Sequence, residues 1–403
     1  MLIAFQYMNR EDSSSVMPPD KSPETKRTDI KTRIKIHDIP YTKANDIPYT
    51  KANDIPYTKV KNILHTKVDN ISSTKVKLDH SPLRALPLKG YIVYDCDVQH
   101  PGDCGGWSDR MSGMYSAYVI SVIVRKHFLI RYSKSGNLED YLSPISFDWR
   151  YNSSILEGKS WSYQDLFSTV PKVIGRGDLA GLRNLFSRDV NFVRFNWDYT
   201  NHFRKFRNIQ NVIPWMLQLH YADIYYEFFH TLFKPTKSVN DEVELLVGSA
   251  SKLACAHIRM GGSATIPGDD IHTKKTQLKD IWNMLKTLEN KNYSIFVATD
   301  SEDVRNQTKS LFAHLLEAKG RILHIDWKVK GGGLASGYRR VVVDFFALTK
   351  CDVMILTKSG FGMMAVYLNT NVSSIYCLTE EELVPCSRYT INDYYPGEVL
   401  SPR

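Results

Sequence analysis

The segment with the most evident chemistry is KLACAHIRMGGSATIPGDD, residues 252–270, in which a histidine and an arginine stand two residues apart. The apolar run around them predicts a β-strand. Because side chains alternate between the two faces of a strand, His257 and Arg259 are expected to point the same way. Two glycines, Gly261 and Gly262, follow and end the strand. A guanidinium at a strand end can hold a diphosphate through two parallel hydrogen bonds, whereas a solvent-reaching arginine beside a buried histidine is the purely structural interpretation.

The elements that would position these residues alternate from residue 252 to 378. The apolar runs KLACAHIR, YSIFVAT, RILHID, CDVMILT and SSIYCL predict five strands. The segments between them predict helices: one with apolar residues at 278, 281, 282, 285 and 288, one with apolar residues at 304, 311, 312 and 315, and two over 338–350 and 360–369. Strands that alternate with helices in this way predict a parallel, doubly wound sheet.

A second βαβ unit is predicted nearer the N-terminus. A strand at about 90–97 leads through a glycine-rich loop into a helix over 111–125, which is followed by a strand over 127–133. The aromatic-rich region 135–250 predicts a strand at 190–197 and helices at 212–233 and 238–249. The sequence therefore predicts two α/β domains.

Polar residues gather where the strands of the second domain end. In a parallel sheet, ligands bind at the carboxyl ends of the strands. The residues at those ends are His257, Arg259 and Gly261, then Thr299 and Asp300, then Asp326, then Ser359 and Gly360.

Ser359 and Gly360, at the last of these strand ends, also stand where a helix is predicted to begin. A helix N-terminus presents unpaired N–H groups that suit a phosphate. The alternative is that Ser359 is an ordinary N-cap. The same stretch also approximates the dinucleotide fingerprint G-x-G-x-x-A. That fingerprint belongs to the first βα turn of a domain, yet only about 40 residues follow here.

Charge argues against a nucleic-acid partner. The 403-residue chain has a net charge of +9, of which residues 1–89 supply +6 through 16 Lys and Arg against 10 Asp and Glu. The remainder is nearly balanced and has no basic, aromatic strip that would follow a phosphate backbone.

The six cysteines form no CxxC pair, so zinc and thioredoxin-type motifs are unsupported. Cys255 and Cys351 lie in apolar runs and are expected to be buried thiols. Two further pairs are close enough in sequence to form disulfides in an oxidising compartment: Cys96/Cys104 and Cys377/Cys386.

The N-terminal residues 1–88 are expected to form a disordered tether that is dispensable for activity. They hold octapeptide repeats from 37 to 76, such as NDIPYTKA, with too little apolar surface for a packed core. No stretch reaches the roughly 20 apolar residues of a membrane span. The protein is thus expected to be cytoplasmic if the chain is complete as written, or to have an anchor that this chain does not show.

Hydrolytic and metal-dependent motifs are missing from the sequence. It holds no G-x-S-x-G elbow, no metal-spaced histidines and no D-x-D at a predicted strand end of the C-terminal domain. Binding of a nucleotide diphosphate by Arg259 and a helix N-terminus, with no metal ion, is the better interpretation.

Three motifs resemble the GT-B fucosyltransferase superfamily, which includes nodulation and core α1,6-fucosyltransferases and protein O-fucosyltransferases. HIRMGG is similar to its H-x-R-x-G/T-D segment, FVATDSEDV to its A-T-D-D/N segment, and VVVDFFALTKCDVMILTKSGFG to its D-x-x-x-L-x-x-x-D…S-x-x-G segment. The glycine-rich loop GDCGGWSDRMSGM resembles the loop and first helix that face the donor. The resemblance covers residues 90–380. It implies two Rossmann-like domains, at 89–250 on the acceptor side and at 251–403 on the GDP-fucose side.

The resemblance also implies roles for single residues. The donor-binding residues would be His257, Arg259, Gly261, Asp300, Asp344, Ser359, Gly360 and Phe361. Arg259 would also be a catalytic residue, because it would contact the diphosphate of GDP-fucose. Gly262 replaces the aspartate that usually ends the first motif, so the catalytic base is unassigned. Candidates by position are Asp109, Asp269 and Asp270.

The function predicted from these residues is an inverting, metal-independent fucosyltransferase. It would move fucose from GDP-fucose to a glycan or glycoprotein, without a cofactor, in the Golgi or secretory pathway. Two alternatives stay open: a non-catalytic sugar-nucleotide or glycan-binding homologue, and another GT-B or dinucleotide enzyme.

Overall fold

A computed structural model of the chain describes residues 88–99, 104–134, 136–165, 170–207, 209–262, 269–323, 325 and 334–399. These residues all belong to one compact unit, Val76–Arg403. The predicted tether and its repeats lie outside the described residues. We call residues 88–250 the N-terminal half and residues 251–399 the C-terminal half.

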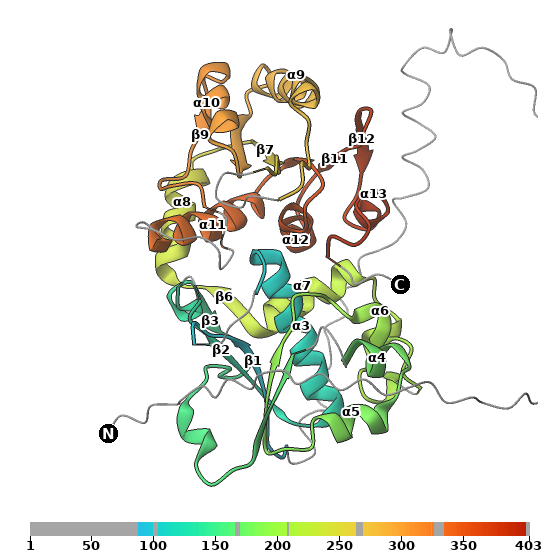
Figure 1. Cartoon of the computed structure of the whole chain (residues 1–403). Helices are drawn as coiled ribbons and strands as arrows, with labels where there is room; N and C mark the ends of the chain where they lie inside the picture. Colours follow the sequence, from blue (N-terminus) through green and yellow to red (C-terminus); the bar gives the residue numbers. More distant parts are fainter. Residues whose placement is uncertain are drawn as a thin grey trace, which may run out of the picture. The chain divides into compact units, whose positions relative to one another are not determined.

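The N-terminal half contains a parallel sheet with the strand order β2-β1-β5-β4 (Figure 1). Its elements are β1 (Tyr91–Cys96), α3 (Trp107–Val124), β2 (His127–Tyr132), η1 (Leu138–Asp140), β3 (Leu142–Pro144), η2 (Ser153–Leu156), β4 (Trp161–Asp165), α4 (Val170–Gly175), α5 (Leu179–Leu185), β5 (Val190–Arg194), α6 (Thr200–Phe203), η3 (Ile209–Asn211), η4 (Pro214–Leu217), α7 (Tyr221–Leu232), β6 (Phe233–Pro235) and α8 (Lys237–Val247). The predicted βαβ unit and the strand at 190 are confirmed. The first helix begins at Trp107, four residues before the predicted start.

The C-terminal half contains a sheet with the order β12-β11-β10-β7-β8-β9, in which only the edge strand β12 is antiparallel among the described strands. Its elements are β7 (Leu253–Ile258), η5 (Lys275–Gln277), α9 (Leu278–Glu289), β8 (Ser294–Thr299), α10 (Glu302–Leu311), β9 (Leu315–Leu316), α11 (Leu334–Leu348), β10 (Val353–Leu356), α12 (Gly360–Leu368), β11 (Ser374–Leu378), β12 (Leu383–Cys386) and α13 (Ile391–Tyr394). Two parallel α/β sheets in one chain confirm the predicted fold class.

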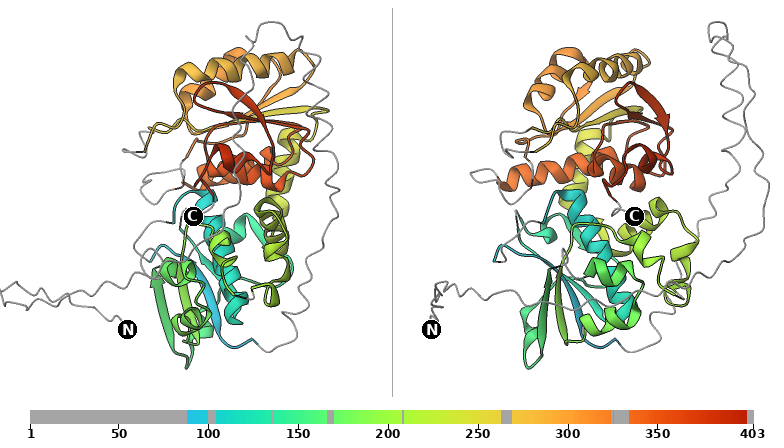
Figure 2. Two further views of the ribbon diagram at one scale, coloured as in Figure 1. Left: turned by 90° about the vertical axis from the view of Figure 1, so that its right-hand side faces the viewer. Right: turned by 45° about the vertical axis from the view of Figure 1, so that its right-hand side comes forward.

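Helices cover both faces of the C-terminal sheet, α9 and α10 on one face and α11 and α12 on the other (Figure 2). Every residue of β7 is therefore buried. Ala254 and Ala256 face α9, whereas Cys255 packs in the core shared with α11 and α12. His257 follows Cys255 by two residues and so lies on the α12 side of the sheet.

One strand prediction is wrong. The described residues of the segment 321–326 form no strand, and the sheet ends instead with β9, where Leu315 pairs with Ile295. The sequence pattern places Leu315 in the preceding helix, but that helix, α10, ends at Leu311. Periodicity alone cannot separate a helix end from a short strand in an apolar run of this length. Asp326 lies outside the described residues.

All six cysteines are paired in disulfides. Cys96–Cys104 and Cys377–Cys386 form as expected in an oxidising compartment. Cys255 and Cys351 are buried, but the prediction that they are free thiols is wrong, because they form the third bond. Parallel pairing of β7 with β10 brings them together from 96 residues apart, which sequence spacing does not reveal.

Helix α3 is one of the helices that join the two halves, together with α7 and α8, which pack on α12 and α11. Most of its residues are buried, and it contacts β1 and β2 on one side and α12 on the other. A helix that is covered on all sides belongs to the core. None of the helices in the described ranges is both long and apolar enough to span a membrane.

Candidate functional site

A cavity of about 400 Å³ opens where the strands of the C-terminal sheet end, against the start of α3. Nine predicted site residues line it: Asp109, His257, Arg259, Asp269, Asp300, Asp344, Ser359, Gly360 and Phe361. Gly261 lies beside it, whereas Asp270 is exposed and does not line it. The fold thus brings most of the predicted residues together, and their individual roles stay predictions.

Arg259 is held between two carboxylates. Its Nη1 donates to Asp300 Oδ2 and its Nη2 donates to Asp269 Oδ2, each at 2.6 Å. The backbone N–H of Arg259 donates to Thr357 Oγ1 at 2.8 Å. These contacts fix the planar guanidinium at the end of β7 and use two of its five N–H groups.

Asp300 is committed to holding this strand end. Besides Arg259, it accepts hydrogen bonds from the backbone N–H groups of Met260 and Gly261, at 2.8 and 3.0 Å. Gly261 has a φ of +72°, and a Cβ there would lie 1.8 Å from the carbonyl oxygen of Asp270. Only glycine fits at this position, because a side chain would be strained and would collide with backbone.

His257 is a neutral imidazole in the cavity wall. Burial lowers its pKa from the usual 6.5 to about 4. Its ring stacks on Phe361 with centroids 5.0 Å apart. A Cβ on Gly362 would lie 2.9 Å from His257 Nδ1, so this glycine of the G-x-G-x-x-A pattern is required by packing.

The N-terminus of α12 meets the N-terminus of α3 at the cavity. Ser359 is the N-cap of α12 and accepts a hydrogen bond from the backbone N–H of Phe361 at 3.3 Å, as the structural alternative predicted. A Cβ on Gly360 would lie 2.9 Å from Ser108 Oγ in α3. Two sets of backbone N–H groups and two positive dipole ends therefore converge on one space.

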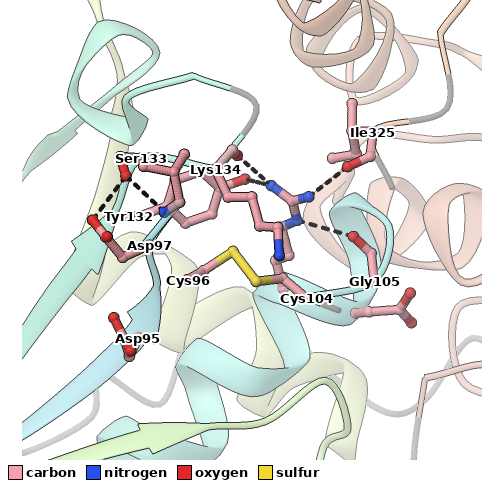
Figure 3. The surroundings of a disulfide bond; sticks show 12 residues. Asp95, Cys96, Asp97, Cys104, Gly105, Tyr132, Ser133, Lys134 and Ile325 are labelled. Carbon is pink, nitrogen blue, oxygen red and sulfur yellow. Dashed lines mark hydrogen bonds between the residues drawn. A yellow bond between two sulfur atoms is a disulfide. The ribbon is translucent and has the colours of Figure 1, made fainter. Parts of the chain in front are cut away.

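The loop before α3 is fixed by a disulfide and a buried arginine. Cys96–Cys104 ties it to the end of β1, and Figure 3 shows Lys134 and Ile325 beside it. Arg110 is fully buried and donates to the carbonyl oxygens of Gly105 at 2.9 Å and Ile325 at 2.5 Å. Because Ile325 belongs to the C-terminal half, Arg110 links the two walls of the cavity.

The lining of the cavity also includes apolar residues and a further carboxylate. Leu323, Ile325 and Val341 line the cavity, together with Asp344 of α11. Burial raises the pKa of Asp344 to about 6, although Arg340 opposes this shift. Asp344 Oδ1 is buried and has no hydrogen-bond partner. A buried carboxylate oxygen without a partner indicates a place for a hydrogen-bond donor.

Four polar residues of the lining were not singled out by sequence reasoning: Ser108, Asn196, His272 and Glu398. Ser108 lies within the glycine-rich motif GDCGGWSDRMSGM. Asn196 and His272 follow recognisable strand ends, after β5 and β7, so a wider search of strand ends would have found them. Glu398 follows no strand of the sheet, and no local signal marks it.

Two further features of the described residues define the surroundings of the site. No group of three or more His, Cys, Asp or Glu side chains among them is arranged to hold a metal ion. A larger cavity, of about 690 Å³, lies in the N-terminal half around Tyr91, His127 and Phe147. It shares no lining residue with the smaller cavity and contains none of the predicted site residues.

The chain is similar to several solved structures. No protein-family model and no curated protein matches the sequence. The structure is similar to that of the fucosyltransferase NodZ from Bradyrhizobium, at 14% identity and a TM-score of 0.44, covering 75% of this chain and 100% of that one. It is also similar to a mutant of Arabidopsis thaliana FUT1 in complex with GDP, at 11% identity and a TM-score of 0.49, covering 76% and 73%.

A further similarity is to POFUT1 in complex with GDP-fucose, at 11% identity and a TM-score of 0.39, covering 69% and 94%. All three TM-scores are below 0.5, so the functional proposal depends on the residues of the cavity itself.

Proposed function

We propose that this protein is a fucosyltransferase-type glycosyltransferase that binds GDP-fucose in the 400 Å³ cavity and transfers the sugar with inversion to a glycan or glycoprotein. The observation that carries the proposal is that one cavity is lined by Arg259, by the N-termini of α3 and α12, and by Asp344 with several apolar residues. A nucleotide sugar likewise combines a charged diphosphate with a flat, largely apolar base.

Asp344 and the apolar residues of the lining suit a guanine. A guanine presents adjacent N–H donors on its pairing edge, and a carboxylate accepts both at once, whereas adenine has no such pair. Asp344 is ionised for the most part at pH 7, since its pKa is about 6. Ala298, Val341 and Phe361 supply apolar surface for the ring.

Arg259 and the N-termini of α3 and α12 suit the diphosphate. Negative charge grows on the leaving GDP as the bond to the sugar breaks, so donors fixed in advance stabilise the transition state more than the ground state. Arg259 and the backbone N–H groups near Gly106 and Gly360 are such donors. We propose that they act without a divalent cation, so that EDTA leaves turnover intact. Restoration of activity by Mn²⁺ or Mg²⁺ would contradict this part of the proposal.

Nucleotide selectivity tests the proposal. GDP is expected to raise the melting temperature, whereas ADP and UDP at the same concentration leave it unchanged. Asp344→Asn should lose most of the preference for GDP, because an amide presents a donor where the carboxylate accepts. Equal binding of the three nucleotides by the unaltered protein would refute the proposed guanine site.

A second function is favoured by one observation. Gly262 stands where the resembling family has an aspartate, and Arg259 is already paired with Asp269. A protein that binds GDP-fucose but does not turn it over is the corresponding candidate. Release of GDP from GDP-fucose, measured alongside GDP binding, separates the two functions.

We further propose that the protein works in an oxidising compartment of the secretory pathway, such as the Golgi. The pairing of all six cysteines supports this, because disulfides are rare in the reducing cytosol. Alkylation of the protein after unfolding in denaturant, without a reducing agent, should find no free thiol. Six alkylated cysteines would contradict the proposal.

A further inference from the structure

Five carboxylates line the cavity, and three of them are occupied by other contacts. Asp300 accepts three hydrogen bonds, and Asp269 holds Arg259 at 2.6 Å and lies 3.7 Å from His272 Nε2. Asp109 Oδ2 accepts the backbone N–H of Gly106 at 2.7 Å and completes the capping box of α3. Each of these carboxylates has a structural task that proton uptake would disturb.

Asp344 is also unsuited to take up a proton from an acceptor. Its side chain is only 9% exposed, and it pairs with Arg340 Nε at 3.4 Å. A general base must reach the hydroxyl that it deprotonates. An acceptor from solvent has little access to a side chain as buried as Asp344.

Glu398 is the carboxylate that remains. Its side chain is 21% exposed, against 13% for Asp300 and 14% for Asp269. Its ion pair is a loose one, with Lys358 Nζ 3.7 Å from Glu398 Oε1. The side chain of Glu398 is therefore more exposed to solvent than those of Asp300 and Asp269, and its ionic contact is longer than theirs.

The backbone on both sides of Glu398 is anchored. Tyr395 is buried, and its hydroxyl donates to the carbonyl oxygens at the ends of two strands, Leu356 at 2.8 Å and Leu378 at 3.0 Å. On the other side, the carbonyl oxygen of Val399 accepts the N–H of Asp198 in the N-terminal half at 3.4 Å.

Between these two anchors, the carbonyl oxygen of Glu398 packs against Gly360 so closely that a Cβ on this glycine would lie 2.6 Å away. The fold thus places Glu398 at the start of α12, where the proposed diphosphate would bind.

We propose that Glu398 is the general base of the proposed transfer reaction. This inference rests on the proposed function. Glu398 takes the proton from the acceptor hydroxyl while the acceptor oxygen bonds to the anomeric carbon of the sugar. The bond from that carbon to the diphosphate oxygen breaks, and its electron pair leaves with GDP. With water as acceptor, the same step yields free fucose and GDP.

GDP release from GDP-fucose in water tests this role with the full chain, because it needs no identified acceptor. Glu398→Gln is expected to lower GDP release about 100-fold or more, as the loss of a general base does. The Kd for GDP should stay within about twofold of its original value, since the amide has the same shape. Glu398→Asp keeps a carboxylate and should retain more activity than Glu398→Gln.

Lys358→Met is the matched control. It removes the ion pair of Glu398 but does not alter the cavity lining. GDP release should stay within about threefold in this variant. Equal losses in Lys358→Met and Glu398→Gln would mean that the pair is structural, and near-native release by Glu398→Gln would overturn the proposal directly.

Sodium azide provides a second measurement that folding defects cannot imitate. Azide is already an anion and needs no base, so it should restore GDP release to Glu398→Ala and form a fucosyl azide. The absence of rescue in a variant that still binds GDP would count against a general base. If the unaltered protein binds GDP but releases none from GDP-fucose, the transfer function fails and the assignment of Glu398 fails with it. If it does not bind GDP, the donor site itself is wrong.

Discussion

The two walls of the cavity are held in different ways. The wall from the C-terminal half is held by hydrogen bonds between strand ends, as when Asp300 of one strand fixes Arg259 of the next. The wall from the N-terminal half is a loop, held by the disulfide Cys96–Cys104 and by Arg110. The first wall is thus held by side chains of the site itself, whereas the second depends on a covalent bond and a buried arginine outside the proposed donor contacts.

Substitution of Arg259 should have the largest effect. Arg259→Lys keeps the charge but loses the planar fork, so kcat/KM with GDP-fucose should fall about 100–1000-fold, or about 3–4 kcal/mol. Arg259→Ala should lose essentially all turnover. The measurement is steady-state GDP release, with the melting temperature recorded for each variant. Near-native turnover by Arg259→Lys would show that Arg259 does not contact the diphosphate.

Removal of the disulfide in the opposite wall should act on binding. The double change Cys96→Ser and Cys104→Ser should lower the free energy of unfolding by about 2–3 kcal/mol, since the bond closes a short loop. It should also raise the Kd for GDP several-fold. The double change Cys377→Ser and Cys386→Ser is the control. The bond between these two cysteines spans 9 residues, close to the 8 of Cys96–Cys104, and neither cysteine lines the cavity. Equal changes of Kd in both double variants would remove the distinction between the walls.

Gly362→Ala tests how tightly the C-terminal wall is packed. The added methyl group would meet His257 Nδ1 and Leu356 Cδ2, each at 2.9 Å, so we expect a loss of about 1–3 kcal/mol in the free energy of unfolding. Gly175→Ala is the control, because its nearest neighbour would be 3.7 Å away. Urea unfolding of both variants gives the comparison, and equal stabilities would show that the space around His257 is not tight.

Two buried groups of the C-terminal wall should respond to pH in opposite directions. The pKa of His257 is lowered to about 4, so the unfolded chain binds this proton more readily. The stability that His257 contributes is present above pH 6.5 and is lost as the pH falls towards 4. The pKa of Asp344 is raised to about 6, so its contribution is present below pH 3.8 and is lost as the pH rises through 6.

Urea unfolding at pH 7 and pH 5 measures both effects. The loss of stability between the two pH values should be smaller in His257→Gln than in the unaltered protein, by about 1–2 kcal/mol. It should be larger in Asp344→Asn. A change of the same sign in both variants would contradict the two pKa shifts.

The smallest effect is expected at Gly262. A positive φ of 60° is tolerated by aspartate, and a Cβ there would meet only Ile271, at 3.7 Å. Gly262→Asp restores the family motif and should change stability by less than about 1 kcal/mol. If Glu398 is the base, GDP release should stay within about threefold. A rise of tenfold or more would instead assign the base to position 262 and leave the natural chain as a weak enzyme.

The sequence by itself determined most of the strands and helices that carry the site, and the strand ends where it lies. The alternation of apolar strands and amphipathic helices is a local property, because period 2 and period 3.6 are set by backbone geometry. His257, Arg259, Thr299 and Ser359 were found in this way, since the carboxyl ends of parallel strands must share one edge of a sheet.

The tertiary structure decided which of these groups are free to act. The bond between Cys255 and Cys351, the pairing of Asp269 with Arg259 and the pinning of Glu398 by Tyr395 and Val399 all depend on which elements pack together. Local periodicity holds no information on such partners. A carboxylate acts as a base or as a structural anchor according to its neighbours, and those neighbours come together only when the chain folds.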